Sequence, residues 1–217
     1  MIEAAEARRF ILNNTSILSP PHVPEMRLHL ADEAHELWHK TETQLGEIGL
    51  PPPFWAFAWA GGQGLARYVL DNPQIVAGRH VLDFASGSSL VGIAAMMAWA
   101  KSVTCADTDP FSAVAAGLNA KLNNVELSTV TADLIGSKIA ADVLLAGDVF
   151  YDREFAERLV PWFEILAASG TKVLIGDPGR SYLPKIRLVK LASYDVAVTR
   201  ALEDAEVKHT TVWRYGA

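Results

Sequence analysis

Small and acidic residues follow four short apolar runs of this 217-residue chain. The first run ends at Asp83, shortly before Gly87, and the next ends at Asp107. Two later runs are followed by Asp148 and Asp177. Parallel strands bring their carboxyl ends to one edge of a sheet, and ligands bind beyond that edge. We therefore expect these residues to lie close together, where carboxylates can hold sugar hydroxyls or a cationic group.

The bend around Gly87 indicates which cofactor fits. Residues 81–95 are typical of a buried strand, a turn of small residues and a helix, whose free amide groups face the turn. A dinucleotide turn needs glycines at relative positions one, three and six. Frames that start at Ala85 or Gly87 both fail, because Leu90 or Ser89 interrupts them. Asp83 would also repel a pyrophosphate and attract a cation, so we predict S-adenosylmethionine, which carries an ammonium and a sulfonium.

Other residues are expected to complete the cofactor site. Asp107, about two dozen residues after Asp83, is placed to accept ribose hydroxyls. Asp133, or amides beside it, is expected to meet the adenine ring. Trp59, next to two glycines, is expected to form a wall whose face stabilises a sulfonium by about 0.5–2 kcal/mol. The residues predicted to bind the cofactor are Trp59, Asp83, Ala85, Ser86, Gly87, Asp107, Thr108, Asp133, Leu134 and Gly147.

Several segments resemble those of known methyltransferases. Residues 81–92 are similar to the first motif of the class I, seven-stranded S-adenosylmethionine-dependent enzymes, with Ala85 and Ser89 where glycines are usual. Gly-Asp-Val-Phe-Tyr at 147–151 looks like the Asp-x-x-Tyr motif of the family 16 methyltransferases. Together with residues 54–63, 107–110 and 173–180, this motif resembles the electron transfer flavoprotein β-subunit lysine methyltransferases. The resemblance covers most of the chain, from about residue 19 to residue 213.

The resemblance implies methyl transfer from S-adenosylmethionine to a protein lysine. The implied substrate is the electron transfer flavoprotein β subunit, and in bacteria a ribosomal protein is a second target. Asp148 is expected to capture and orient the lysine, with proton acceptance as a second role, and Tyr151 to supply an aromatic wall or a hydroxyl. Phe150 and Asp177 are expected to contact the substrate. The structural alternatives are a helix cap at Asp148, simple packing at Tyr151 and an Asp-stabilised turn at Asp177.

The order of the predicted elements indicates the fold. From residue 78 onward, strands alternate with helices, which predicts a Rossmann-like, mostly parallel seven-stranded sheet with helices on both faces and an antiparallel C-terminal strand. A helix is expected near 183–191, and residues 194–200 and 208–215 are expected to pair as a hairpin. We predict one methyltransferase domain over 1–217, with an N-terminal helical extension at 1–50 and a catalytic core at 51–217.

The N-terminal extension has its own predicted elements. Helices are expected over 4–13 and 32–46, with an extended piece at 26–30 between them. His35 and His39 lie four residues apart on the second helix, but no further ligands accompany them, so we predict no metal site.

Composition excludes several classes of protein. The formal net charge is −6, which argues against a nucleic-acid-binding protein. Cys105 is the only cysteine, so no disulfide framework is expected. The longest apolar run is about ten residues, too short for a membrane span. We expect a cytoplasmic location, or the mitochondrial matrix if the source is eukaryotic. Two alternatives stay open at this point: a nicotinamide-dependent oxidoreductase and a non-catalytic binding module on the same fold.

Overall fold

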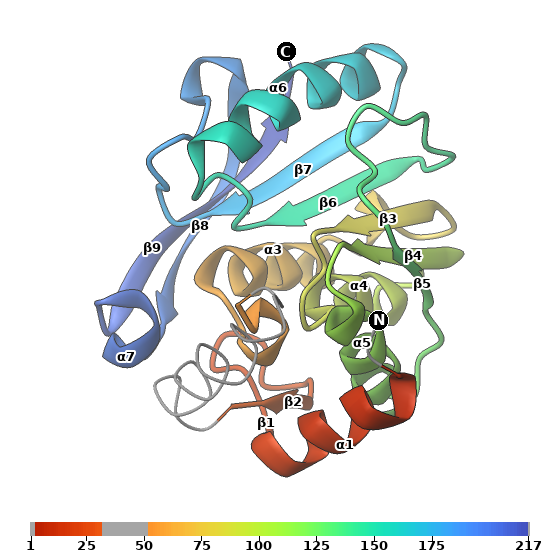
Figure 1. Ribbon diagram of the computed structural model, residues 1–217. Coiled ribbons are helices and arrows are strands. Elements are labelled where there is room, and N and C mark those ends of the chain that lie inside the picture. Colours follow the sequence, from red (N-terminus) through yellow and green to blue (C-terminus); the bar gives the residue numbers. More distant parts are fainter. Residues whose placement is uncertain (1–2, 32–51, 217) are drawn as a thin grey trace.

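A seven-stranded, mostly parallel sheet forms the centre of the protein (Figure 1). The computed structural model describes residues 3–31 and 52–216, and the order of strands in them is β5-β4-β3-β6-β7-β9-β8. The first five strands are parallel, and β9 pairs antiparallel with both β7 and β8. The strands are β3 (His80–Phe84), β4 (Ser102–Asp107), β5 (Ser128–Thr131), β6 (Val143–Gly147), β7 (Lys172–Asp177), β8 (Leu188–Ala197) and β9 (Val207–Tyr215). The predicted fold class is confirmed.

Helices cover both faces of the sheet (Figure 1). One face carries α3 (Ala60–Asp71), α4 (Leu90–Met97) and α5 (Pro110–Leu122), and the other carries α6 (Arg153–Ala168). Successive side chains of a strand point to opposite faces. In β6, Leu145 accordingly joins the core cluster under α3 and α4, whereas Leu144 joins the cluster under α6. Burial on both faces explains why β6 is an unbroken apolar run rather than an alternating one.

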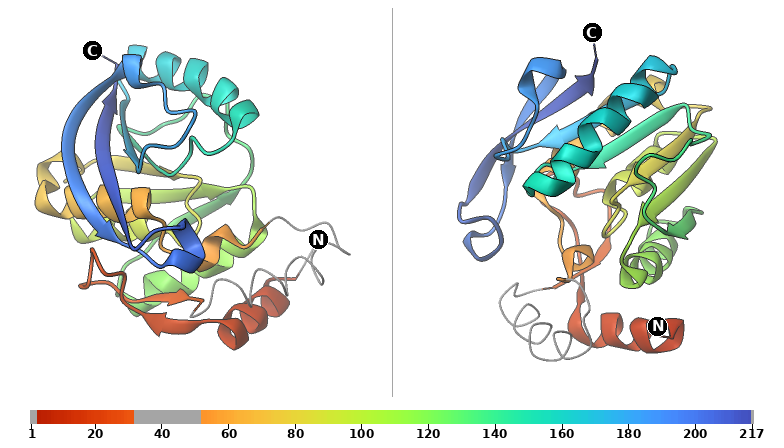
Figure 2. Two further views of the ribbon diagram at one scale, coloured as in Figure 1. Left: turned by 90° about the vertical axis from the view of Figure 1, so that its left-hand side faces the viewer. Right: turned by 45° about the horizontal axis from the view of Figure 1, so that its top comes forward.

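The N-terminal segment packs outside α5. The helix α1 (Ala4–Asn14), expected at 4–13, lies on the side of α5 away from the sheet (Figures 1 and 2). Trp55, in the 3₁₀ turn η1 (Phe54–Ala56), stacks on Phe111 of α5 with ring centroids 5.7 Å apart. After α1, the strand β1 (Ser16–Leu18) pairs antiparallel with β2 (Leu28–Leu30), so the described part of the extension is not purely helical.

Some predictions for this segment fall outside the description. The helix expected at 32–46, with His35 and His39, lies outside the described residues. In the rest of the chain, no group of three or more His, Cys, Asp or Glu side chains could hold a metal ion. No described helix is long and apolar enough to cross a membrane.

The predicted helix at 183–191 is wrong. That segment contains a 3₁₀ turn, η3 (Lys185–Arg187), followed directly by the strand β8. The strand starts at Leu188, opposite Tyr215, and pairs along β9 as far as Ala197, which provides backbone hydrogen-bond partners that the sequence pattern does not reveal. The hairpin itself was predicted, and it is confirmed. At its far end lies the short helix α7 (Arg200–Glu203), on the side of the sheet where α3 lies (Figure 1).

Candidate active site

A cavity of about 640 Å³ opens at the carboxyl edge of the parallel strands. Its lining includes residues at or just after the ends of β3, β4, β5 and β6, together with η1 and the start of α3. β3 and β6 are neighbours in the sheet, although β4 and β5 lie between them in the chain. Such a reversal of strand order is where ligands bind in open parallel sheets. Of the residues predicted to converge at this edge, Asp83, Gly87, Asp107 and Asp148 line the cavity, whereas Asp177 does not.

The turn after β3 has a strained backbone. Ala85, Gly87 and Ser89 have φ angles of 52°, 48° and 60°. A residue with a side chain in this left-handed region stores about 1–2 kcal/mol of strain, whereas glycine adopts it freely. Ala85 and Ser89 are the two positions at which the similar methyltransferases usually carry glycine. The turn therefore keeps the backbone path that the motif requires, at some cost in stability.

The carboxyl group of Asp83 lies beneath this turn. Its Oδ2 atom accepts a hydrogen bond from the Gly92 N–H group at 2.8 Å. A Cβ atom on Gly92 would lie 2.9 Å from that oxygen, so only glycine allows the approach. Burial raises the pKa of Asp83 to about 8, and the charge of Asp107 adds to this effect. A cationic group beside Asp83 would lower that pKa and stabilise the carboxylate.

Asp107 ties the turn to the end of β4. Its Oδ2 atom accepts the N–H group of Gly87 at 2.9 Å, and its Oδ1 atom accepts the N–H group of Asp109 at 3.0 Å. Each oxygen of a carboxylate has a second lone pair, so Asp107 can also accept two hydroxyl groups from the cavity. This is the role expected for the residue that holds a ribose.

The charges that line the cavity suit a cationic cofactor. Arg158 and Arg180 are the cations among the described lining residues, and both are paired: Arg158 with Asp133, and Arg180 with Asp148 and Glu203. A pyrophosphate would therefore meet Asp83 and Asp107 near the turn and, among the described lining residues, no cation without a carboxylate partner. S-adenosylmethionine fits, since Asp83 can face its ammonium and Asp107 its ribose.

Aromatic side chains cluster in another part of the lining, the aromatic end, which adjoins the Gly87 turn through Phe54. The Phe54 ring lies 5.8 Å from the Trp59 ring and 5.6 Å from the Tyr151 ring, centroid to centroid. Phe57 is buried and packs against Trp59 at 5.9 Å. Trp59 lines the cavity, and its contact with the sulfonium stays a prediction. The cation at its face is the guanidinium group of Arg180, whose Cζ atom lies 5.8 Å from the ring centroid.

Asp148, directly after β6, lines the cavity together with the turn residues of the cofactor end and the rings of the aromatic end. Its φ angle is 58°, and its N–H group donates to the Gly176 carbonyl at 2.9 Å. Its Oδ2 atom accepts the Gly62 N–H group at 3.0 Å. Its Oδ1 atom accepts two N–H groups of Arg180, Nε at 3.0 Å and Nη2 at 2.7 Å. Burial raises the pKa of Asp148 to about 7, Arg180 lowers it and Glu203 raises it.

The same network caps the N-terminus of α3. The first amide groups of a helix lack partners within the helix, and carboxylates are stabilised there. Gly62 donates to Asp148, and Ala60 donates to Glu203 Oε1 at 3.2 Å. Arg180 bridges the two carboxylates, with Nη2 3.1 Å from Glu203 Oε2. The helix cap predicted as an alternative for Asp148 concerned α6, and that helix is capped by Asp152 instead.

Three predicted contacts lie elsewhere. Phe150 is fully buried and packs against Phe163, so its predicted contact with substrate is wrong. Asp177 is also buried outside the cavity, where its Oδ1 atom accepts the N–H groups of Gly179 and Arg180; the turn predicted as the alternative is what forms. Leu134 packs against the core cluster under α6 and does not line the cavity. Phe150 and Leu134 are stabilised by packing in the core, and Asp177 is stabilised by the hydrogen bonds of its own turn.

The other predicted site residues line the cavity. Asp133 does so with its carboxylate bonded to Arg158 and to the Ile135 N–H group. Tyr151 is half-exposed, and its ring faces Phe54 and Phe155. The remaining predicted residues in the lining are Trp59, Asp83, Ala85, Ser86, Gly87, Asp107, Thr108, Gly147 and Asp148.

Sequence reasoning missed Arg180 and Glu203 as members of the site. Arg180 carries a usable signal, because it ends the segment 173–180 and follows a strand that points to the cavity. Glu203 carries no such signal in the sequence. Its contact with Ala60 depends on where the hairpin of β8 and β9 places α7.

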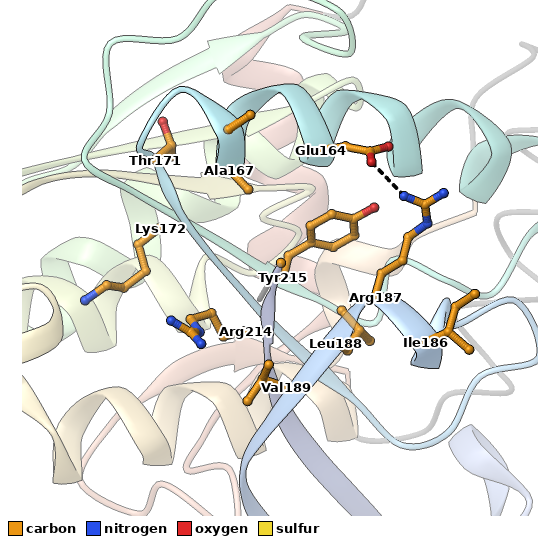
Figure 3. Close-up of a pocket in the computed structure, with 12 residues that line it drawn as sticks. Glu164, Ala167, Thr171, Lys172, Ile186, Arg187, Leu188, Val189, Arg214 and Tyr215 are labelled. Carbon is orange, nitrogen blue, oxygen red and sulfur yellow. Dashed lines mark hydrogen bonds and ion pairs between the residues drawn. The ribbon is translucent and has the colours of Figure 1, made fainter.

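A second cavity lies at the opposite end of β7 (Figure 3). Thr171 and Lys172, at the start of the strand, line it with residues of α6, β8 and β9. Glu164 is the acidic residue in this lining, and it is bonded to Arg187 (Figure 3). This cavity lies away from the carboxyl edge of the sheet and contains none of the predicted site residues. We assign the active site to the first cavity.

Proteins of similar sequence are methyltransferases. The chain is 40% identical over 215 residues to the electron transfer flavoprotein β-subunit lysine methyltransferase of Xenopus laevis, covering 96% of this chain and 86% of that protein. The human protein of the same name is 32% identical and is covered over 82% of its length, with 97% of this chain. The chain belongs to the electron transfer flavoprotein β-subunit lysine methyltransferase family. Its enzyme class follows: this is an S-adenosylmethionine-dependent methyltransferase, rather than a nicotinamide-dependent oxidoreductase or a binding module.

Two further comparisons agree with this assignment. The family model for ribosomal protein L11 methyltransferase matches residues 67–149, which contribute much of the cofactor end of the cavity. The crystal structure of magnesium protoporphyrin IX methyltransferase from Synechocystis, with bound SAM, superimposes with a TM-score of 0.55 at 11% identity, covering 85% of this chain and 98% of that one. The likeness to that structure shows the fold that the two enzymes share.

Proposed function

We propose that this enzyme methylates a lysine side chain of a protein, and that the protein is the electron transfer flavoprotein β subunit. The named relatives support the substrate. The observation that carries the chemistry is that Asp148 lines the same cavity as the Gly87 turn and the aromatic side chains, with one N–H group bonded to Oδ2 and two to Oδ1. A carboxylate oxygen has two lone pairs, so Oδ2 has the capacity to accept a second N–H group.

A lysine must lose a proton before it can be methylated. Its ordinary pKa is about 10.4, so being neutral near pH 7.4 costs about 4 kcal/mol. Burial between Phe54, Trp59 and Tyr151 lowers this cost, because an apolar site disfavours the ammonium form. The aromatic end of the cavity is therefore suited to a long aliphatic side chain that ends in an amine.

The free acceptor of Asp148 can orient the neutral amine. S-adenosylmethionine supplies an electrophilic methyl group on its sulfonium. An amine that donates one N–H to Asp148 Oδ2 is held at a fixed angle, so that its lone pair can be aimed along the line of transfer. The Gly62 N–H group and Arg180 hold the carboxylate itself in one orientation. After transfer, Asp148 can accept the proton that the product must release.

A methylation assay with the purified substrate tests the proposal. The electron transfer flavoprotein β subunit of the same source is incubated with the enzyme and a labelled donor, and the modified residue is located by mass spectrometry. We expect label on lysine. Label on another residue type, or on no residue of this substrate, contradicts the proposal.

Asp148→Ala provides the matched test of the site. This variant should bind S-adenosylhomocysteine with the parent affinity and lose methyl transfer by about 100-fold or more, because the acceptor that orients the amine is gone. Transfer at the parent rate would remove Asp148 from the mechanism. A ribosomal protein, the second target that the resemblance implies, should be tested as an alternative substrate in the same assay.

A further inference from the structure

One half-buried arginine, Arg180, contacts several carboxylates in the active site. The Arg180 guanidinium bonds Asp148 through Nε and Nη2 and pairs with Glu203 through Nη2. Asp177, whose Oδ1 atom accepts the Arg180 N–H group, adds further negative charge nearby. Only Asp148 and Arg180 of this group line the cavity, and Glu203 is buried behind them.

The position of Arg180 matters because its guanidinium group bonds Oδ1 of the same carboxyl group whose Oδ2 is the proposed partner of the substrate amine. Its guanidinium group faces Trp59, which is also a wall of the aromatic end. A substrate amine that reaches Asp148 Oδ2 therefore comes close to a fixed positive charge. This arrangement differs from a bare carboxylate, which would hold the amine as an ammonium ion.

Two protonation states must be correct at once for transfer. Three acceptor positions of Asp148 are already bonded, so a proton on the carboxyl group would occupy the fourth, which the amine needs. The amine attacks only as the neutral base. Burial favours a protonated Asp148, Arg180 opposes this effect, and Glu203 adds to it, so that with Arg180 present the pKa is about 7. A nearby cation opposes both effects, because it stabilises a carboxylate and destabilises an ammonium ion.

We propose that Arg180 is a positioning residue whose charge favours the ionised form of Asp148 and the uncharged form of the bound amine. Its two N–H groups also fix the carboxylate so that the free acceptor of Oδ2 stays available. The role toward the amine depends on the proposed lysine methylation, whereas the role toward Asp148 does not. The two can therefore be tested apart.

Other ionisable groups near Asp148 also affect its ionisation or could titrate beside it. Asp177 and Glu203 act against Arg180 on the ionisation of Asp148. Burial and the charges of Asp152 and Asp107 raise the pKa of Tyr151, so its phenol stays neutral. The sulfonium of the donor, when bound, acts in the same direction as Arg180. Among the described cavity-lining residues, Arg180 is the cation bonded to Asp148.

Three variants separate charge from structure. Arg180→Met removes the charge and keeps much of the length of the side chain. Arg180→Lys keeps the charge but loses the pair of N–H groups that bonds Asp148. Glu203→Gln retains a carbonyl for the Ala60 N–H group and removes one negative charge. Loss of the arginine and loss of the glutamate should move the ionisation of Asp148 in opposite directions. General destabilisation cannot produce a pair of opposite shifts.

The first measurement needs no substrate. The carboxyl carbon of Asp148 is titrated by NMR, with its signal assigned by its absence in Asp148→Asn. We expect its midpoint to rise by about one pH unit or more in Arg180→Met, to stay close to the parent value in Arg180→Lys, and to fall in Glu203→Gln. Unchanged midpoints in Arg180→Met and Glu203→Gln would overturn the proposal.

The second measurement is the pH dependence of kcat/KM for methyl transfer from about pH 6.5 to 10. For Arg180→Met, kcat/KM should be about tenfold below the parent value at pH 7.5 and should approach the parent value at high pH. For Glu203→Gln, the increase of kcat/KM with pH should begin at a lower pH than in the parent enzyme. A loss in Arg180→Met by the same factor at every pH would show a structural role only. A parent enzyme that methylates nothing would contradict the proposed function, while the NMR titration would still decide the role of Arg180.

Discussion

Gly61 and Gly176 touch backbone to backbone where the N-terminus of α3 crosses the end of β7. A Cβ atom on Gly176 would lie 2.1 Å from the Gly61 carbonyl oxygen, and a Cβ atom on Gly61 would lie 2.3 Å from the Gly176 carbonyl oxygen. The same added atom on Gly61 would lie 2.5 Å from Asp148 Oδ2. This contact lets the α3 amides reach the carboxylates at the edge of the sheet.

Gly61→Ala should therefore lower the free energy of unfolding by about 2 kcal/mol or more, because neither backbone can yield without moving a helix or a strand. Gly62→Ala is the matched control. A Cβ atom there meets only Leu90 and Val91, at 3.8 and 3.9 Å, so this variant should stay within about 1 kcal/mol of the parent. Urea unfolding measures both. Equal stabilities of the two variants would contradict the close packing.

Ala85→Gly should stabilise the protein. Ala85 has a φ angle of 52°, and replacing it by glycine releases about 1 kcal/mol of backbone strain, more than the half-buried methyl group contributes. Ala94→Gly, in the buried interior of α4, should instead destabilise by about 1 kcal/mol. Thermal unfolding of the two variants should show Tm shifts of opposite sign. A lower Tm for Ala85→Gly would show that its methyl group matters more than the strain.

Stability should fall as the pH rises, to an extent set by Asp83. Its pKa is about 8 in the folded protein and about 4 in the unfolded chain, so between these values only the folded state keeps the proton. The stabilisation is complete below about pH 4 and is lost as the pH rises toward 8. Asp109 and Asp148, with folded pKa values of about 6 and 7, act in the same direction.

Asp83→Asn removes the largest of these contributions. Without cofactor, the Tm of this variant should improve relative to the parent as the pH rises from about 5 to 8. A constant Tm difference for Asp83→Asn across this range would mean that Asp83 is ionised in the folded protein.

Asp107→Ala should weaken the binding of S-adenosylhomocysteine by about 10- to 100-fold, the effect of losing hydrogen bonds to a charged acceptor. Asp133→Asn should have a much smaller effect, because its carboxylate already bonds Arg158 and the Ile135 N–H group. Calorimetric titration measures both affinities. A larger loss in Asp133→Asn would reverse the assignment of ribose and adenine contacts.

The local pattern of the sequence was enough to predict the strand-turn-helix at 81–95 and the acidic tips of the next strands. These features depend on residues that are neighbours in the chain: apolar runs make buried strands, and small residues make the bend. The same kind of reasoning failed at 183–191, because the apolar residues of so short a segment fit the periodicity of a helix as well as that of a strand. Pairing with β9 decides between them, and that partner lies more than ten residues away.

Tertiary structure alone decided how the site is completed. Phe150 and Tyr151 are adjacent aromatic residues, yet the path of the backbone places the first in the core and the second in the cavity wall. Arg180 and Glu203 reach Asp148 and the α3 amides only because strand order and the β8–β9 hairpin bring distant segments together. Sequence spacing determines which residues share an element, but the partners of a buried charge are set by which elements meet.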